Sequence, residues 1–298
     1  MLSRRHFLQT SALALASSLA VPGLARSAPG PAAATIAAAE GFAALEKASG
    51  GRLGVTLLDT RTGKRVGHRQ DERFPMCSTI KWMLAAAALH RAERQPGFLD
   101  ERLPMRAEDL LDHAPTTRRH VGKDLSVRDL CRTTMVTSDN PAANLLLRHL
   151  GGPPALTAFM RSHGDAVTRS DRYEPELNRF TPGDPRDTTS PSASAASLQR
   201  FVLGDALRPA SRQQLADWLI DNETGDATLR AGLGDRWRVG DKTGSNGKDT
   251  RNDIGVLWPL GGGSAWVLTA YLQGASVDSG QRDAVLARVA ALAERMIG

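Results

Sequence analysis

The chain is poor in cysteine and, after its first residues, has no long apolar run. Its two cysteines, Cys77 and Cys131, allow at most one disulfide, and the sequence does not show whether their Cβ atoms meet. No Cys-x-x-Cys or His-Glu-x-x-His motif is present, and the seven histidines are scattered. A protein-bound metal site is therefore not indicated, and we expect neither a metal nor a cofactor.

A strong excess of one charge is also missing. The 298 residues include 38 Lys and Arg against 32 Asp and Glu, a net charge of +6. Residues 1–28 hold three arginines and no acid, which leaves +3 for the rest of the chain. Such a mild balance, without a block of Lys or Arg, does not indicate nucleic-acid binding.

The first 28 residues have the composition of an export signal. Residues 3–8, Ser-Arg-Arg-His-Phe-Leu, form a twin-arginine pattern, and the apolar, alanine-rich stretch 11–21 follows. This stretch of 11 residues is much shorter than the ~20 residues of a membrane-spanning helix. We therefore expect cleavage after Ala25 or Ala28, export to the periplasm by the twin-arginine route, and no stable membrane anchor.

Hydrophobic periodicity predicts elements in an order that indicates one interrupted sheet. Strand patterns occur near both ends of the chain, and the middle, from about 76 to 220, is mostly helical. Residues 164–191 are rich in proline and glycine and predict a long loop, a kind that is usually functional or disordered. The expected strands are 53–59, 65–68, 237–242, 252–258 and 265–272; the expected helices are 35–48, 81–94, 127–134, 142–150, 155–163, 193–203, 211–221 and 281–297.

Residues Ser78-Thr79-Ile80-Lys81 combine a hydroxyl with an amine. A serine hydroxyl is a weak nucleophile at neutral pH and needs a base. If a helix begins near Ser78, the i, i+3 spacing puts Lys81 on the same face, and the helix N-terminus favours a developing oxyanion. The motif is weak by itself, because residues 245–248, Ser-Asn-Gly-Lys, match it in a predicted turn.

Two further motifs carry polar groups at the ends of predicted elements. Ser138-Asp139-Asn140 offers a hydroxyl, a carboxylate and an amide, but is also typical of an N-cap ahead of the helix at 142–150. Lys242-Thr243-Gly244-Ser245 ends a predicted strand. Its lysine and hydroxyls suit an anionic group, and its glycine lets a ligand approach the backbone; a plain glycine turn is the alternative.

The order and separation of the three motifs make them specific. Sixty residues separate Ser78 from Ser138, and 104 separate Ser138 from Lys242. This set is that of class A β-lactamases and penicillin-binding proteins. Over essentially all of its mature region the chain resembles a class A serine β-lactamase, above all the chromosomal class A enzymes of xanthomonads. The resemblance implies hydrolysis of the β-lactam amide of penicillins and cephalosporins through a serine acyl-enzyme, giving antibiotic resistance.

The resemblance also implies an α/β fold of two lobes. A five-stranded antiparallel sheet with flanking helices is expected from residues 29–70 and 225–298. An inserted all-helical lobe is expected from residues 71–224, with a catalytic loop at 169–187. The expected partners are small-molecule β-lactams, and a monomer is the expected state.

A fourth element distinguishes hydrolases from their relatives. Hydrolysis of an acyl-enzyme needs a base and an ordered water, and the long loop offers Glu174 with Asn178 four residues on. A penicillin-binding DD-peptidase or transpeptidase, the main alternative, lacks this pair in the family pattern. A non-enzymatic β-lactam sensor is a further alternative, but sensors are normally tethered to a membrane.

By resemblance, each motif residue takes a role. Ser78 is the nucleophile, Lys81 or a water on Glu174 is the base for acylation, and Ser138 passes a proton to the lactam nitrogen. The backbone N–H groups of Ser78 and Ser245 form the oxyanion hole, and Glu174 with Asn178 directs deacylation. The substrate-binding residues are Asn140, Lys242, Thr243, Gly244, Ser245, Arg251 and His113.

Other positions carry a weaker resemblance. Arg251 matches only if one residue is skipped after Ser245, and His113 falls where many relatives place an aromatic at the pocket rim; exposed side chains are the alternative for both. Arg172 and Asp187 match an ion pair that pins the catalytic loop.

The cysteines depart from the family pattern. Relatives bridge the equivalent of Cys131 to the position that is Ala85 here, or the equivalent of Cys77 to the position of Asn246. Neither position is a cysteine in this chain. We therefore predict two free thiols.

Overall fold

The computed structural model describes residues 31–298, so the export signal expected at residues 1–28 lies outside the described residues. Five antiparallel strands form the main sheet in the order β2-β1-β9-β8-β7. The expected five-stranded antiparallel sheet with helices is confirmed. Its strands are β1 (Arg52–Asp59), β2 (Arg65–His68), β7 (Trp237–Ser245), β8 (Arg251–Pro259) and β9 (Trp266–Gln273).

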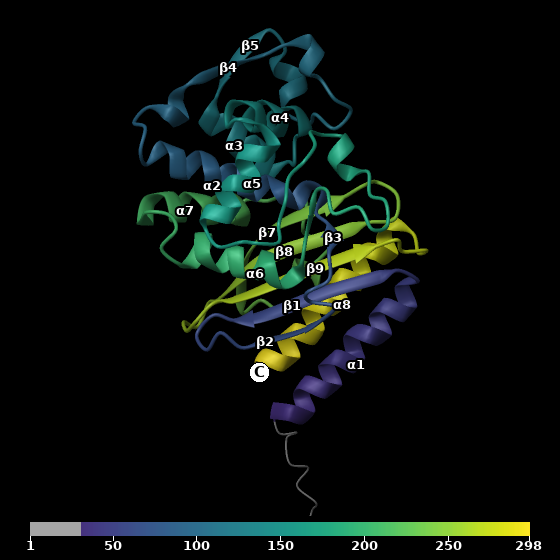
Figure 1. The fold of residues 1–298 in the computed structure, drawn as a ribbon. Coiled ribbons are helices and arrows are strands. Elements are labelled where there is room, and N and C mark those ends of the chain that lie inside the picture. Colours follow the sequence, from purple (N-terminus) through teal and green to yellow (C-terminus); the bar gives the residue numbers. More distant parts are fainter. Residues whose placement is uncertain (1–30) are drawn as a thin grey trace, which may run out of the picture.

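Helices cover both faces of this sheet (Figure 1). The terminal helices α1 (Pro31–Ser49) and α8 (Ser279–Ile297) contact each other on one face, and α6 (Pro191–Leu198) contacts β1 and β9 on the other. Side chains alternate between the faces of a strand. Leu268 of β9 therefore packs in the core beneath α1 and α8, and Tyr271 packs with the helical part. Burial on both faces explains why β1 and β9 are nearly continuously apolar.

The helical part surrounds α2 (Lys81–Ala92). Residues 81–89 of α2 are all buried, which accounts for the dense run of alanine, leucine and methionine in its sequence. Lys81, the first residue of α2, is also buried, but its charge does not fit an apolar core. The neighbouring helices are α3 (Val127–Val136), α4 (Asn140–His149), α5 (Gly152–Ser162) and α7 (Pro209–Ile220).

Two local expectations differ from the structure. The helix expected at 81–94 begins at Lys81, so the condition that a helix starts near Ser78 is not met: a short 3-10 helix, Cys77–Ile80, precedes it. The loop at 164–191 contains a 3-10 turn, Glu176–Asn178, and the short strand β6 (Thr188–Thr189). A strand of two residues, such as β6, is too short to show a periodic pattern in the sequence. The two-stranded pairs are β3 (Phe74–Pro75) with β6, and β4 (Arg102–Met105) with β5 (Lys123–Ser126).

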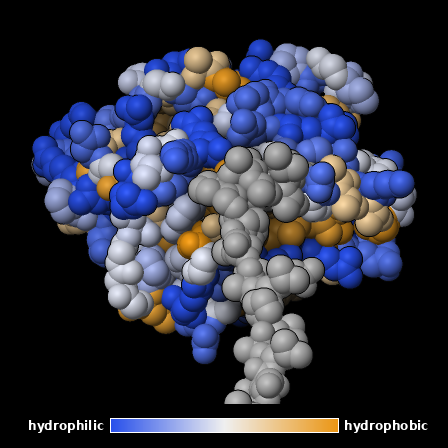
Figure 2. Space-filling view, turned by 90° about the horizontal axis from the view of Figure 1, so that it is seen from below, coloured by the Kyte–Doolittle hydropathy of each residue, from blue (hydrophilic) through white to orange (hydrophobic). Residues whose placement is uncertain are grey.

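The surface seen in Figure 2 is mostly hydrophilic, with hydrophobic residues in small groups between polar ones. No helix in residues 31–298 is both long and apolar enough to cross a bilayer. Within the same residues, no group of three or more His, Cys, Asp or Glu side chains is arranged to hold a metal ion.

Both cysteines are free and buried, which confirms the expectation of two thiols. Cys77 lies in the 3-10 turn, and Cys131 lies in α3. Burial raises the pKa of each thiol, so neither forms a thiolate at neutral pH.

We expect a thiol reagent such as DTNB to label no cysteine in the native protein and two in denaturant, because burial blocks access and suppresses the thiolate. Absorbance at the thionitrobenzoate band measures the count. If the protein, unfolded without a reducing agent, shows no reactive thiol, the prediction of two free cysteines is wrong.

Candidate active site

A cavity of about 320 Å³ lies between the edge strand β7 and the helical part. It brings together residues from all four motifs, although they are up to 167 positions apart between Ser78 and Ser245. The cavity is lined by Ser78, His113, Ser138, Asn140, Asn178, Thr224, Thr243, Gly244, Ser245, Gly247 and Arg251.

Ser78 sits in the 3-10 turn just before α2. The residue before it, Cys77, has φ +48°, a left-handed conformation that a side chain rarely adopts. Nζ of Lys81, in the first turn of α2, lies 2.8 Å from Oγ of Ser78. The spacing of three residues therefore places amine and hydroxyl together, as the sequence predicts, although the turn between them is 3-10 rather than α.

Lys81 is fully buried and lies at the centre of the site. Its Nζ lies 2.6 Å from the backbone oxygen of Ser138, 2.5 Å from Oδ1 of Asn140 and 3.1 Å from Oε1 of Glu174. Burial lowers the pKa of Lys81, and the Glu174 carboxylate opposes that shift. The side-chain nitrogen of Lys81 therefore contacts the 3-10 turn, the 138–140 loop and the long loop.

The 138–140 motif caps a helix and also reaches the cavity. Asp139 is the N-cap of α4, where its carboxylate accepts from the N–H of Ala142 at 3.1 Å. Ser138 has φ +59° and directs its Oγ to a point 3.2 Å from Nζ of Lys81 and 3.2 Å from Nζ of Lys242. Asp139 can cap α4 while Ser138 faces the two lysines, because the two functions use different side chains.

Lys242 reaches the site from β7 and is fully buried. Burial, followed by the positive charge of Lys81, lowers its pKa to about 7. A lysine at this pKa changes its charge near neutral pH, where an anionic ligand would hold it protonated.

Glu174 is buried and faces Ser78. Its Oε1 lies 3.3 Å from Oγ of Ser78, and its Oε2 accepts from Nδ2 of Asn178 at 2.6 Å. The two residues of the expected Glu-x-x-x-Asn pair therefore contact each other. The 3-10 turn Glu176–Asn178 folds Asn178 back toward the Glu174 carboxylate.

Sequence reasoning missed Asn144, which holds Glu174 in place. Oδ1 of Asn144 accepts from the backbone N–H of Glu174, and its Nδ2 donates to the backbone oxygen of the same residue, both at 2.9 Å. The sequence did contain a signal: Asn144 stands four residues after Asn140, among the apolar residues of the helix expected at 142–150. A buried amide needs hydrogen-bond partners.

The neck of the long loop is held by Arg172 and Asp187. Nε of Arg172 donates to Oδ2 of Asp187 at 2.6 Å, and Oδ1 accepts from the backbone N–H groups of Asp171 and Arg172. Burial raises the pKa of Asp187 in spite of these donors. The backbone oxygen of Asp187 accepts from Met76 at 3.0 Å, which connects the loop to the turn that carries Ser78.

The β7 side of the cavity depends on close backbone approach. A Cβ on Gly244 would lie 2.7 Å from the backbone oxygen of Met76, so only glycine lets β7 pass the Ser78 turn. Oγ1 of Thr243 lies 2.5 Å from Oγ1 of Thr224, a cavity residue that sequence reasoning also missed because no motif contains it.

The remaining expected residues, Arg251, His113 and Ser245, all line the cavity, but they differ in the hydrogen bonds that hold their side chains. Arg251 lines it, but its Nε donates to Oδ1 of Asp283 at 2.6 Å, so its charge is partly neutralised. His113 is exposed at the rim, with Nε2 3.2 Å from the backbone oxygen of Thr137. Oγ of Ser245 accepts from the N–H of Gly247, so the second Ser-x-x-Lys match lies in a turn and not in a helix.

Comparison with known proteins agrees with this geometry. The family model "Beta-lactamase enzyme family" matches residues 37–296. Beta-lactamase L2 of Stenotrophomonas maltophilia is 67% identical over 303 residues, covering 100% of both chains.

Two solved structures have the same fold. A β-lactamase from Xanthomonas campestris pv. campestris has a TM-score of 0.87 at 54% identity, covering 89% of this chain and 99% of that one. The class A β-lactamase of the last common ancestor of Gram-negative bacteria has a TM-score of 0.86 at 56% identity, covering 88% and 100%. The expected likeness to class A enzymes of xanthomonads is confirmed. The chain belongs to the class A β-lactamases, and it hydrolyses β-lactams, an activity that gives resistance to these antibiotics.

Proposed function

We propose that the chain opens penicillins and cephalosporins through an acyl-enzyme on Ser78. The observation that carries this mechanism is the position of Lys81, whose Nζ lies 2.8 Å from Oγ of Ser78 and 3.1 Å from the carboxylate of Glu174. A hydroxyl with two bases in reach is an activated nucleophile.

In acylation, Oγ of Ser78 attacks the lactam carbonyl carbon. Its proton passes to Lys81 or to Glu174, and both bases are within 3.3 Å. The backbone N–H groups of Ser78 and Ser245 bind the oxyanion, and each such donor is worth roughly 100- to 1,000-fold in rate. As the C–N bond breaks, Ser138 gives its proton to the lactam nitrogen and regains one from the lysines beside it.

In deacylation, Glu174 takes a proton from a water that attacks the ester carbonyl. Asn178 holds the Glu174 carboxylate from the far side, and the ring of hydrogen bonds to Asn144 fixes its backbone. The ester C–O bond breaks, Ser78 recovers its proton, and the product leaves as an acid. The carboxylate thus acts as a positioned general base.

Substrate recognition rests on the positive side of the cavity. Lys242, Thr243 and Ser245 bind the substrate carboxylate, with Arg251 as a further cation that shares its charge with Asp283. Asn140 binds the acylamide side chain through its amide, and His113 contacts the substrate at the rim.

The wider proposals concern the whole chain. Residues 29–70 and 225–298 act as one α/β lobe and 71–224 as a helical lobe, with Arg172 and Asp187 pinning the catalytic loop 169–187. The protein leaves the cell interior by the twin-arginine route, is cleaved after Ala25 or Ala28, and acts in the periplasm as a monomer. Neither nucleic acid nor a membrane anchor takes part.

We expect the variant Glu174→Ala to acylate but not to turn over, because the serine remains activated by Lys81 while the base for deacylation is gone. Turnover of nitrocefin falls by at least about 100-fold, the lower range for a general base. Intact-mass measurement then shows protein plus one substrate.

Glu176→Ala, which removes an exposed carboxylate from the same loop, is the matched control and keeps parental activity. If Glu174→Ala hydrolyses nitrocefin like the parent, the assigned role is wrong. If the parent itself accumulates a stable adduct, the DD-peptidase alternative is favoured.

We expect kcat/KM for a carboxylate-bearing penicillin to decline as pH rises through about 7, because Lys242 is an ammonium below its pKa and neutral above it. A pH profile of kcat/KM measures this alkaline limb. The variant Lys242→Arg keeps its positive charge at every working pH, so we expect its alkaline limb to lie at higher pH. Identical profiles for parent and variant would assign the limb to another group, such as Lys81.

We expect Asn144→Ala to lower the free energy of unfolding by about 1–3 kcal/mol, because it leaves the buried N–H and C=O of Glu174 without partners. Chemical denaturation measures the loss. Gln213→Ala, which removes an exposed amide from α7, serves as control and stays close to the parent. Equal stability of the two variants would contradict a positioning role for Asn144.

A further inference from the structure

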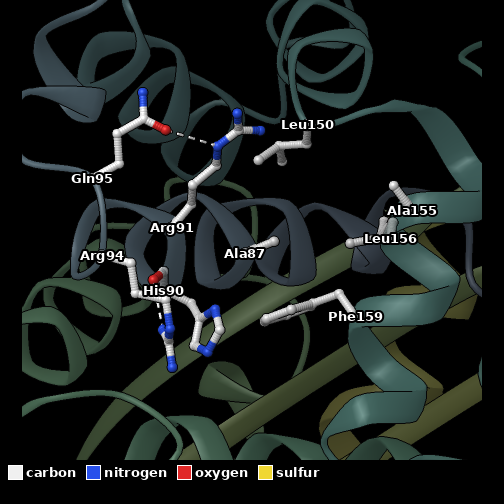
Figure 3. Close-up of a pocket in the computed structure, with 9 residues that line it drawn as sticks. All are labelled: Ala87, His90, Arg91, Arg94, Gln95, Leu150, Ala155, Leu156 and Phe159. Carbon is white, nitrogen blue, oxygen red and sulfur yellow. Dashed lines mark hydrogen bonds between the residues drawn. The ribbon is translucent and has the colours of Figure 1, made fainter.

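A second cavity, of about 420 Å³, lies at the other end of α2 from Ser78 (Figure 3). Ala87 of this cavity is six residues after Lys81, about 9 Å along the helix. The two cavities share no lining residue. This one is lined by Ala87, His90, Arg91, Arg94, Gln95, Leu150, Ala155, Leu156 and Phe159.

The floor of this cavity is apolar. Ala87 of α2 and Ala155 of α5 leave space between the two helices, because each has only a methyl side chain where they face the cavity. Leu156 is 2% exposed, and the ring of Phe159 packs edge-on to His90 with centroids 5.3 Å apart. Such a surface favours a hydrocarbon or aromatic body.

The rim is cationic. Arg91 and Arg94 are both exposed, and Figure 3 shows their guanidinium groups on opposite sides, that of Arg91 toward Leu150 and that of Arg94 beside His90. Nε of Arg91 donates to Oε1 of Gln95 at 3.3 Å, and a terminal nitrogen of Arg94 donates to the backbone oxygen of His90 at 2.9 Å. Within residues 31–298 neither guanidinium forms an ion pair with an acid.

Among the residues that the structure describes, no carboxylate lines the cavity. Glu93 lies between the two arginines in sequence, but its Oε1 accepts from the backbone N–H of Arg208 at 2.7 Å. Burial, then the charge of Arg94, lowers the pKa of His90, so the imidazole is neutral at neutral pH and adds aromatic surface.

We propose that this cavity binds a small amphipathic organic anion, with an aromatic or short aliphatic body on the floor and a carboxylate on Arg91, while Arg94 adds positive charge on the other side. Guanidinium groups bind carboxylates through paired N–H donors, and a volume of about 420 Å³ is within the range of small-molecule sites. The site is separate from β-lactam hydrolysis and does not depend on the mechanism proposed for it.

The test uses the mature protein and two probes of the same shape. 2-Naphthoate carries the charge, and 2-naphthamide does not. In NMR titrations we expect naphthoate to shift the amides of Ala87 and Leu156 saturably, and naphthamide to bind about ten-fold more weakly, the loss of one charge-assisted hydrogen bond.

We expect the double variant R91Q/R94Q to bind naphthoate about ten-fold more weakly. The control R119Q/R288Q, which loses two exposed arginines elsewhere, keeps the parental affinity. Ala155→Trp fills the floor and abolishes binding while nitrocefin hydrolysis stays parental. Equal binding of the two probes, no effect of R91Q/R94Q, or shifts centred on Ser78 would each overturn the proposal.

Discussion

The buried amine of Lys81 is the group on which the site depends. Its Nζ contacts Ser78, Ser138, Asn140 and Glu174, which come from three segments far apart in sequence. Removing a charged or strongly polar nitrogen from water costs several kcal/mol unless acceptors replace the water. The helical core that buries Lys81 therefore requires these acceptors in place, and the same requirement brings the proposed catalytic groups into contact.

Holding those segments strains the backbone. Three of the four non-glycine residues with left-handed φ in residues 31–298, Cys77, Ser138 and Asp187, lie at the turn before Ser78, the facing loop and the neck of the long loop; the fourth is Arg69. Each such conformation costs about 1–3 kcal/mol. The two apolar cores on either face of the sheet, the Asn144 ring around Glu174 and the ion pair of Arg172 hold these turns in place. Most of this strain therefore lies around the candidate active site.

Local pattern predicted the elements well and their ends less well. Helices and strands of eight or more residues have a clear period, so β1, α2 and α8 begin or end within two or three residues of expectation. The 3-10 turn before Lys81 was missed, because one turn is too short to show a period. Asn144 and Thr224 were missed for another reason: each acts on a residue from a distant segment, and no spacing along the chain records that contact.

The sequence by itself determined the order of the elements, the motifs and the family, because these depend on residue type and short spacing. Only the tertiary structure decided that one carboxylate faces both Ser78 and Asn178, that Arg251 shares its charge with Asp283, and that an uncompensated pair of arginines rims a second cavity. Those facts are distances between segments, and they are set by loop closure and by the packing of both faces of the sheet, which no local pattern encodes.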